Sequence, residues 1–319
     1  GYKALEANTT ASGNTAYGYR TLVANTTGTE NVAVGNEVLA ANTTASYNTG
    51  VGRGALNANT TGTLNSAVGQ NALLRNTTGG ENTACGQGAL VNNTTASYNT
   101  AVGRSSLGAN TTGQYNTASG YKALTANTTG HSNAAVGYTA LEANTTGVEN
   151  TASGFGALQN NTTGSYNSAS GYRALQTNTT ASSNTANGYK ALYANTTAQY
   201  NTASGYKALY TNTTGHSNAA VGFQALYYNT TGHSNTCMGT DSGENITTGS
   251  YNVCIGAHAA SWSVPLTTGS NNLHIGYATA ASAAGVDSEM VVTVGGNGAT
   301  GKGSGTGFFD DFGSIYQSS

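Results

Sequence analysis

The stretch Asn110-Thr-Thr-Gly-Gln-Tyr-Asn-Thr-Ala-Ser-Gly-Tyr-Lys-Ala-Leu-Thr-Ala126 is one copy of a unit that repeats along most of this chain. Its Asn-Thr-Thr triplet occurs 14 times at a constant spacing of 17 residues. The triplets begin at Asn8, Asn25, Asn42, Asn59, Asn76, Asn93, Asn110, Asn127, Asn144, Asn161, Asn178, Asn195, Asn212 and Asn229. A short fixed period is the signature of a repeat architecture, in which each repeat packs only on its neighbours.

Three further positions are nearly the same in every copy. The first is a second Asn, found at Asn14, Asn31, Asn48, Asn65, Asn82, Asn99, Asn116, Asn133 and Asn150 and in later copies. The others are a Gly, as at Gly18, Gly35, Gly52 and Gly69, and a Leu, as at Leu22, Leu39 and Leu56. A residue that recurs at one position of every copy indicates that the geometry of the coil restricts the residue type there.

The length and composition of the unit predict an all-β fold, a parallel β-solenoid. Helical-hairpin repeats need about 33 residues, so a unit of 17 residues is too short for them. Thr, Tyr and Val favour strands, and Asn-Thr pairs favour turns. We therefore expect residues 1–276 to form a solenoid of 17-residue coils, each with two short strands and two turns.

Alternation along Asn-Thr-Ala-Ser-Gly predicts which side chains point inward. Successive strand residues face opposite sides, so the Asn, Ala and Gly share one face. Because these residues are nearly fixed, we expect them inside, with stacked Asn side chains forming amide ladders. The Gly is expected at a tight approach or a positive φ, and the Leu at the opposite edge of the coil. The Thr and the variable residues are expected to face outward.

The repeat weakens toward the C-terminus. Residues 257–266 contain the only Trp and the only Pro, Trp262 and Pro265, and are expected to form an insertion loop in a late coil. Residues 277–319 are richer in apolar side chains and Gly, with a strand expected at 290–294. We predict that this segment is a C-terminal neck or cap.

Composition excludes several classes of function. Charged residues make up 7% of the chain, against about 25% in a typical soluble domain. The net charge of −2 gives no electrostatic attraction to nucleic acid, and no apolar run is long enough for membrane insertion. Acidic residues are scattered, and neither a nucleophile elbow nor a metal motif occurs. We therefore expect no enzyme activity, no metal and no cofactor.

One Gly-rich stretch matches a nucleotide-binding pattern. Residues 296–301 fit G-x-G-x-x-G, and Lys302 extends the match toward a P-loop. Gly303 stands where a P-loop needs Ser or Thr, and no helix is expected to follow. A Gly-rich linker explains the stretch better.

His and Cys residues recur at equivalent repeat positions. His131, His216 and His233 share one position, and a variable surface turn explains them better than a transition-metal site. Cys237 and Cys254 replace the Ala in adjacent coils, so we expect small buried thiols.

Every Asn-Thr-Thr triplet also matches the N-glycosylation acceptor N-x-[ST]. We expect the Asn to lie in a buried ladder instead, which leaves the Thr hydroxyls as candidate O-glycan positions. The candidate glycan positions of the first copies are Asn8, Asn25, Asn42, Asn59, Thr9, Thr10, Thr26 and Thr27. Tyr recurs before the second Asn and after the Gly, as at Tyr115 and Tyr121, and suits either carbohydrate stacking or subunit packing.

The segment Asn116-Thr-Ala-Ser-Gly-Tyr-Lys-Ala-Leu124 resembles the head repeats of trimeric autotransporter adhesins. Those heads are left-handed parallel β-rolls whose three chains pack side by side. The resemblance covers most of the chain and implies a homotrimer, although the unit here is longer by the Asn-Thr-Thr turn.

A second resemblance concerns the C-terminal segment. Ser288-Glu-Met-Val-Val, Thr300-Gly-Lys-Gly-Ser-Gly-Thr-Gly-Phe308 and Gly313-Ser-Ile-Tyr-Gln317 are similar to the region before the intramolecular chaperone of phage tail fibres and tailspikes of the endosialidase type. In that family the chaperone trimerises the fibre and is then cut off, and this sequence contains no chaperone domain. The resemblance implies a mature, homotrimeric tail fibre.

These inferences predict an extracellular homotrimeric fibre, a phage tail fibre or adhesin shaft, that attaches to cell-surface carbohydrate through many weak contacts. The first alternative is a free-standing, glycosylated filament assembled head to tail through exposed coil edges. An ice-binding solenoid ranks lower, because the paired Thr are adjacent and point to opposite faces. A glycan-cleaving tailspike would need clustered carboxylates, which the sequence lacks.

Overall fold

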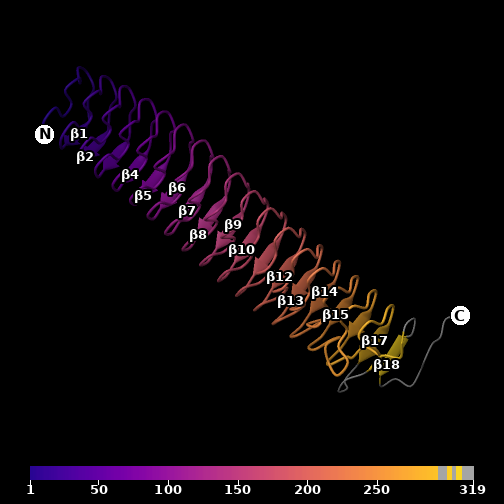
Figure 1. Cartoon of the computed structure of the whole chain (residues 1–319). Coiled ribbons are helices and arrows are strands. Elements are labelled where there is room, and N and C mark those ends of the chain that lie inside the picture. Colours follow the sequence, from indigo (N-terminus) through magenta and orange to yellow (C-terminus); the bar gives the residue numbers. More distant parts are fainter. Residues whose placement is uncertain (294–299, 304–306, 311–319) are drawn as a thin grey trace. The chain divides into compact units, whose positions relative to one another are not determined.

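The computed structural model describes residues 1–293, 300–303 and 307–310, the last of these by their backbone alone. The described residues form strands, turns and bends, and none of them is helical. The chain divides into two compact units, Gly1–Thr163 and Gly164–Ser319. Within each unit the chain winds as a parallel β-solenoid, which confirms the predicted all-β fold class (Figure 1).

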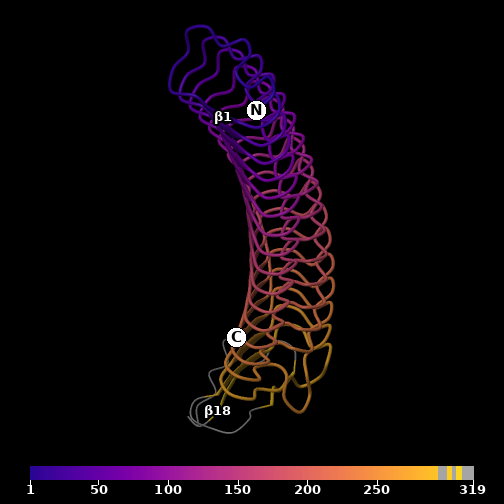
Figure 2. The ribbon, with the colours of Figure 1, turned by 90° about the vertical axis from the view of Figure 1, so that its left-hand side faces the viewer.

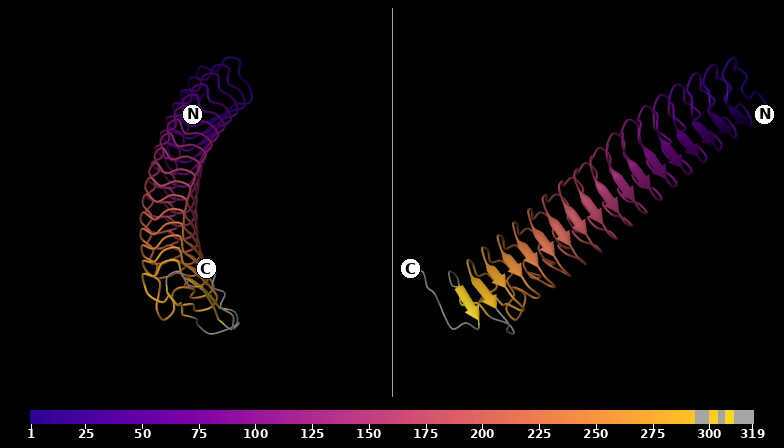
Figure 3. Two further views of the ribbon diagram at one scale, coloured as in Figure 1. Left: turned by 90° about the vertical axis from the view of Figure 1, so that its right-hand side faces the viewer. Right: turned by 180° about the vertical axis from the view of Figure 1, so that it is seen from behind.

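Each coil contributes one short strand to the sheet of its unit. The strands of the first unit are β1 (Thr15–Tyr17), β2 (Val32–Val34), β3 (Thr49–Val51), β4 (Ser66–Val68), β5 (Thr83–Cys85), β6 (Thr100–Val102), β7 (Thr117–Ser119), β8 (Ala134–Val136) and β9 (Thr151–Ser153). Those of the second are β10 (Ser168–Ser170), β11 (Thr185–Asn187), β12 (Thr202–Ser204), β13 (Ala219–Val221), β14 (Thr236–Met238), β15 (Val253–Ile255), β16 (Leu273–Ile275), β17 (Met290–Thr293) and β18 (Gly307–Asp310). In each unit the strands line up on one side of the coils and the turns on the other (Figure 3).

Strand pairing follows the repeat. Each strand pairs in parallel with the strand of the next coil of its unit, so Ala16 of β1 lies opposite Ala33 of β2. Cys254 of β15 lies opposite His274 of β16, because three extra residues lengthen the coil between them. Equivalent residues of successive coils therefore form rows along each unit, and Figure 2 shows the coils stacked in this way.

The coil contains one strand, where the sequence predicts two. The rest of the coil is built from turns in which bulky residues adopt positive φ. In coil 110–126 these residues are Tyr115 (φ 58°), Lys122 (φ 54°) and Leu124 (φ 52°), together with Gly120 (φ 144°). A positive φ costs a non-glycine residue on the order of 1 kcal/mol. The predicted second strand is wrong because these left-handed turns carry the chain around instead.

The core of each coil is thin. Ala118 in the middle of β7 and the pair Ala123–Leu124 have no exposed surface. The backbone N–H of Leu124 donates to the carbonyl of Ala140 in the next coil, 3.0 Å away. Coils are thus joined by backbone hydrogen bonds at the Leu corner as well as in the sheet.

Parallel pairing continues past the predicted end of the solenoid. β16 pairs with β17 and β17 pairs with β18, so residue 276 does not mark the last paired strand. The insertion at 257–266 lies between β15 and β16, with Trp262 exposed and Leu266 buried. Residues 296–299 of the G-x-G-x-x-G match and residues 311–319 of the predicted neck lie outside the described residues.

Candidate binding surface

Two rows of Asn form hydrogen-bonded ladders inside the coils. In the row of the second Asn, Asn116 Nδ2 donates to Asn99 Oδ1 at 3.3 Å. Asn116 Oδ1 in turn accepts from the backbone N of Asn133 at 3.0 Å. In the row of the first Asn, Asn110 Nδ2 donates to Asn93 Oδ1 at 3.0 Å. These buried amides therefore satisfy backbone and side-chain groups of neighbouring coils.

In most coils one backbone carbonyl joins the two ladders. The carbonyl of Gly130 accepts from Asn116 Nδ2 and from Asn127 Nδ2, each at 2.9 Å. The second-Asn residues singled out in the sequence all hydrogen-bond along this row, namely Asn14, Asn31, Asn48, Asn65, Asn82, Asn99, Asn116, Asn133 and Asn150.

The recurring Gly and Leu are placed by backbone geometry and burial. The Gly residues singled out in the sequence have positive φ, at Gly18, Gly35, Gly52 and Gly69. At Gly120 a Cβ atom would clash with the carbonyl oxygen of Gly137 in the next coil. The Leu residues singled out are fully buried, at Leu22, Leu39 and Leu56. The Gly residues therefore fix the backbone path of the coil, and the Leu residues fill its core.

Burial excludes N-linked glycans from the first-Asn row of the folded coils. Asn25, Asn42 and Asn59 have no exposed surface. The Nδ2 of Asn42, the atom that a glycan would modify, donates to Asn25 Oδ1 at 2.9 Å and to the Ala45 carbonyl at 3.0 Å. Asn8 in the first coil is partly buried, and its Nδ2 donates to the Ala11 carbonyl at 3.1 Å.

The two Thr of each triplet differ. Thr26 is half-buried, and its Oγ1 donates to the carbonyl of Thr43 at 3.1 Å. Thr27 is exposed, as are Thr9 and Thr10 of the first coil. The second Thr of the triplet therefore forms a hydroxyl row at the surface.

The outer face of the strands carries no charged residue. The middle residue of each strand from β2 to β17 is buried, and the residues on either side of it point outward. Among these outward residues of β1–β17 there is no Asp, Glu, Lys or Arg. In the second unit the face becomes apolar, with Val253 and Ile255 in β15 and Leu273 and Ile275 in β16.

Six Tyr rings of the second unit lie in face-to-face stacks. Stacks in the row after the Gly join Tyr172, Tyr189, Tyr206 and Phe223 at centroid distances of 5.1–5.2 Å. Stacks in the row after the Leu join Tyr193, Tyr210 and Tyr227 at 5.2 Å. Because a neighbouring ring covers each inner face, these rows present ring edges and hydroxyls to a ligand.

Two Lys side chains lie between these stacks. Lys190 Nζ is 5.5 Å from the ring centroid of Tyr189 and 5.2 Å from that of Tyr193. Lys207 Nζ is 5.4 Å from the ring centroids of both Tyr206 and Tyr210. Cation–π contacts at such distances stabilise by about 0.5–1 kcal/mol at exposed sites. The rings and Lys stems are therefore held as one ordered surface.

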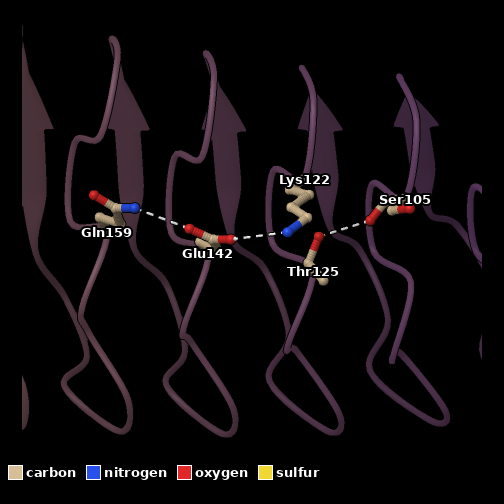
Figure 4. A network of polar contacts seen from close by, with 5 residues as sticks. All are labelled: Ser105, Lys122, Thr125, Glu142 and Gln159. Carbon is tan, nitrogen blue, oxygen red and sulfur yellow. Dashed lines mark hydrogen bonds and ion pairs between the residues drawn. The ribbon is translucent and has the colours of Figure 1, made fainter.

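In the first unit, a carboxylate neutralises the Lys at the same repeat position. Lys122 Nζ lies 3.8 Å from Glu142 Oε1, and Gln159 Nε2 donates to Glu142 Oε2 at 2.9 Å (Figure 4). Nearby, Thr125 Oγ1 donates to the carbonyl of Ser105 at 2.7 Å. These contacts link successive coils across two adjacent rows of the surface.

Two hollows with matching linings lie on the surface, one in each unit. The first has a volume of about 330 Å³ and is lined by Thr112, Gln114, Tyr115, Thr129 and His131. The second has a volume of about 270 Å³ and is lined by Thr197, Ala198, Gln199, Tyr200, Thr214 and His216. Each lies between neighbouring coils and combines an aromatic ring with polar groups, as small binding sites do.

Recurring His and Cys residues of the second unit lie next to their equivalents in the adjacent coil. His216 and His233 stack with centroids 4.8 Å apart, and the Nδ1 of His216 lies 3.2 Å from Ser217 Oγ. Cys237 and Cys254 are buried neighbours in β14 and β15, and burial raises the pKa of the Cys237 thiol well above its usual value. Among the described residues, no group of three or more His, Cys, Asp or Glu could hold a metal ion.

A buried His in β16 was not singled out in the sequence. His274 occupies the inward place that Ala holds in most coils, and neither ring nitrogen has a hydrogen-bond partner. Burial lowers its pKa to about 4, and the nearby Glu289 carboxylate opposes that shift. The sequence Asn272-Leu-His-Ile-Gly276 fits the repeat as a further coil, and its His falls at the inward Ala position.

Glu289 takes the place of the next Asn in the ladder. Its backbone N donates to Asn272 Oδ1 at 2.8 Å. Its buried carboxylate accepts from the backbone N of Ser282 at 3.0 Å and of Gly303 at 2.8 Å. Glu289 therefore ties the segment after β16 to the last ladder Asn.

Comparison with known proteins gives no match, whether to a family model, a curated protein or a solved structure. None of the described residues forms a helix with the length and apolarity needed to cross a bilayer.

Proposed function

We propose that this chain forms the shaft of an extracellular, non-catalytic fibre in which three copies pack side by side. The fibre, a phage tail fibre or an adhesin, attaches to cell-surface carbohydrate, and residues 277–319 form its neck. Length and multivalent display provide the function, since several weak sites on one shaft bind more tightly than one alone.

The uncharged strand face is the observation that supports side-by-side packing. Lys122 and Glu142 lie outside the strands, and the outward residues of β1–β17 include no charged side chain. Depletion of charge is typical of the buried centre of a protein interface. Two outward side chains per coil expose on the order of 100 Å², so eight coils offer roughly the 800 Å² that one partner buries in a standard interface.

The composition of this face in the second unit favours a protein partner over an ice surface. Met238, Ile255 and Leu273 differ in size and shape and carry no hydroxyl. A crystalline surface would require identical groups at regular spacing, whereas another protein surface can pack against side chains of varied shape.

The native mass of the purified protein tests the fibre. We expect light scattering to give a discrete species near three times the chain mass of 31.9 kDa. A single-chain mass would contradict the trimer. An open-ended mass distribution would favour the head-to-tail filament instead.

A charged substitution tests which face packs. Ile255→Lys places a charge on the strand face and should convert the trimer to monomers, because an unpaired charge would be buried in the interface. Thr248→Lys is the matched control, since Thr248 is exposed in a turn of the same coil. A trimer that survives Ile255→Lys would mean that another face packs.

A milder variant covers the case in which Ile255→Lys does not fold. Ile255→Ser introduces a residue already present in this row at Ser170 and Ser204. It should fold with an unchanged circular dichroism spectrum and weaken the trimer, which dilution series would reveal.

A further inference from the structure

We propose that each of the two surface hollows binds one pyranose ring of a glycan, stacked on Tyr115 in the first unit and on Tyr200 in the second. This site gives the proposed fibre its ligand class, and its role in attachment rests on that proposed function.

Tyr115 and Tyr200 each have one open ring face, because a small residue follows each of them in the row. The next residue of the row is Ser132 for Tyr115 and Ser217 for Tyr200. Tyr115 stacks on Tyr98 of the preceding coil with centroids 5.1 Å apart, which leaves its other face toward the hollow. The two rings are 58% and 64% exposed, so they can accept a ligand, unlike the rings inside the longer stacks.

Polar groups surround each open ring. His131 Nδ1 lies 3.3 Å from Ser132 Oγ, and His216 Nδ1 lies 3.2 Å from Ser217 Oγ, so Nε2 is the ring nitrogen left for a ligand. The exposed amide of Gln114, or of Gln199 in the second hollow, offers both donors and an acceptor.

The chemistry of these groups matches a sugar. A pyranose presents a face of C–H groups, which packs on an aromatic ring, and a rim of hydroxyls, which need donors and acceptors. Exposed Thr hydroxyls, Thr112 and Thr129 in the first hollow, lie in both contributing coils. A flat hydrocarbon would leave these polar groups unused, and the hollows contain no charged residue to select a free ion.

The same combination occurs twice in the sequence. Gln-Tyr in one coil followed by His in the next is found at 114–131 and again five coils later at 199–216. Tyr47, in the same row and also 58% exposed, has neither feature, because Leu64 follows it in the row and Thr63 replaces the His. Tyr47 is therefore the natural control.

The size of the hollows limits both the size of the ligand and the affinity of binding. The volumes of about 330 and 270 Å³ lie just above and just below the lower limit of the roughly 300–1,000 Å³ of ligand pockets, which suits one sugar ring. Shallow sites of this kind bind with dissociation constants on the order of 1 mM. Useful attachment would then depend on several copies of the site.

Saturation-transfer NMR on the wild-type protein tests the site. The probes are methyl β-D-galactopyranoside, methyl β-D-glucopyranoside and methyl α-D-mannopyranoside, with acyclic sorbitol as the polyol that lacks a ring face. We expect transfer to the ring C–H protons of at least one pyranoside and none to sorbitol. Absence of transfer to all three pyranosides would overturn the site.

Matched variants locate the binding. Tyr115→Ser combined with Tyr200→Ser should lower the affinity about tenfold, whereas Tyr47→Ser should leave it unchanged. Ser is native in this row at Ser132 and Ser217, so these variants should fold. The corresponding Tyr→Phe variants keep the ring face and should keep most of the binding. An equal loss in Tyr47→Ser would overturn the assignment.

The native mass of the same samples separates this site from the fibre. A trimer that binds no pyranoside would keep the fibre and remove the site. A single chain that binds a pyranoside through Tyr115 and Tyr200 would keep the site and remove the trimer.

Discussion

An amide side chain suits the interior of this coil because it donates and accepts at once without carrying charge. Asn116 donates to Asn99 Oδ1 in the preceding coil and accepts from the backbone N of Asn133 in the next, so it joins two neighbouring coils. Leu124 is held by apolar packing instead. Its positive φ is unfavourable, and the complete burial of its side chain offsets that cost. Hydrogen bonding and packing with the neighbouring coils thus determine which residue type occupies each of these positions.

Removing one ladder amide should destabilise the protein strongly. Asn116→Ala leaves the buried backbone N–H of Asn133 without its side-chain acceptor and the Gly130 carbonyl with one donor fewer. Each unsatisfied buried group costs about 1–3 kcal/mol, so we expect the free energy of unfolding to fall by roughly 3 kcal/mol. Urea titration measures the change. The exposed outer-row variant Asn187→Ala is the control and should change stability little; equal losses in both variants would contradict the ladder's importance.

His274 should make stability depend on pH. Its folded pKa of about 4 lies below the usual His pKa of 6.5, so the folded state favours the neutral ring. The stabilising contribution is present above pH 6.5 and is lost as the pH falls toward 4, by at most about 3 kcal/mol. Urea titrations at neutral and acidic pH measure this loss.

The variant His274→Val assigns that pH dependence. Val291 already occupies the equivalent inward place in β17, so Val fits the row. We expect a smaller loss of stability on acidification and greater stability at neutral pH, because two unpartnered ring nitrogens are removed. An unchanged acid sensitivity in the variant would point to Glu289 or another buried group.

Within a coil, the sequence predicted one strand and its inward Ala correctly, but it did not predict the left-handed conformation of the turns. The strand of Thr117–Ser119 follows from alternation, and the buried Ala118 follows from its recurrence. Tyr115 and Lys122 are not residues that favour positive φ, so local propensity gave no sign of the left-handed turns. Pairing with neighbouring coils decides that geometry, and it overrides the local preference.

The candidate site was only partly predictable for the same reason. Recurrence showed the Tyr rows, but a ring face is open or covered according to the residue one coil away. Comparing Tyr115 with Ser132 and Tyr47 with Leu64 would have separated the open ring from the covered one. The hollows themselves depend on how neighbouring coils stack, which composition does not reveal.

The Tyr stacks should contribute measurably to stability. Tyr189 stacks on both Tyr172 and Tyr206. Each such pair stabilises by about 0.5–1.5 kcal/mol beyond area burial, so Tyr189→Ala should lower the free energy of unfolding by roughly 2 kcal/mol. Tyr17→Ala is the control, because Tyr17 is 74% exposed. A loss in Tyr189→Ala no larger than in Tyr17→Ala would show that the stacks form without stabilising the coil.

Stability along a stack of coils is the sum of repeat and neighbour terms. Deleting residues 59–75 removes one complete coil and joins Ala58 to Asn76, which keeps every row in register. We expect this deletion to fold with a nearly unchanged circular dichroism spectrum and thermal midpoint. Deleting residues 59–67 instead shifts the Asn, Gly and Leu rows and should abolish cooperative unfolding. Equal behaviour of the two deletions would contradict row register as the basis of the fold.

The Asn ladders also give each unit a net electric dipole along its coils. Asn133 Nδ2 donates back to Asn116 Oδ1, and Asn150 Nδ2 donates back to Asn133 Oδ1, so the amide dipoles align and add as peptide dipoles do in a helix. Backbone bonds run both ways, from Leu124 forward to Ala140 and from Lys122 back to Arg104, and largely cancel. Each unit therefore has a positive pole toward its N-terminal coils and a negative pole toward its C-terminal coils. Copies packed in parallel would reinforce this field, whereas antiparallel copies would cancel it.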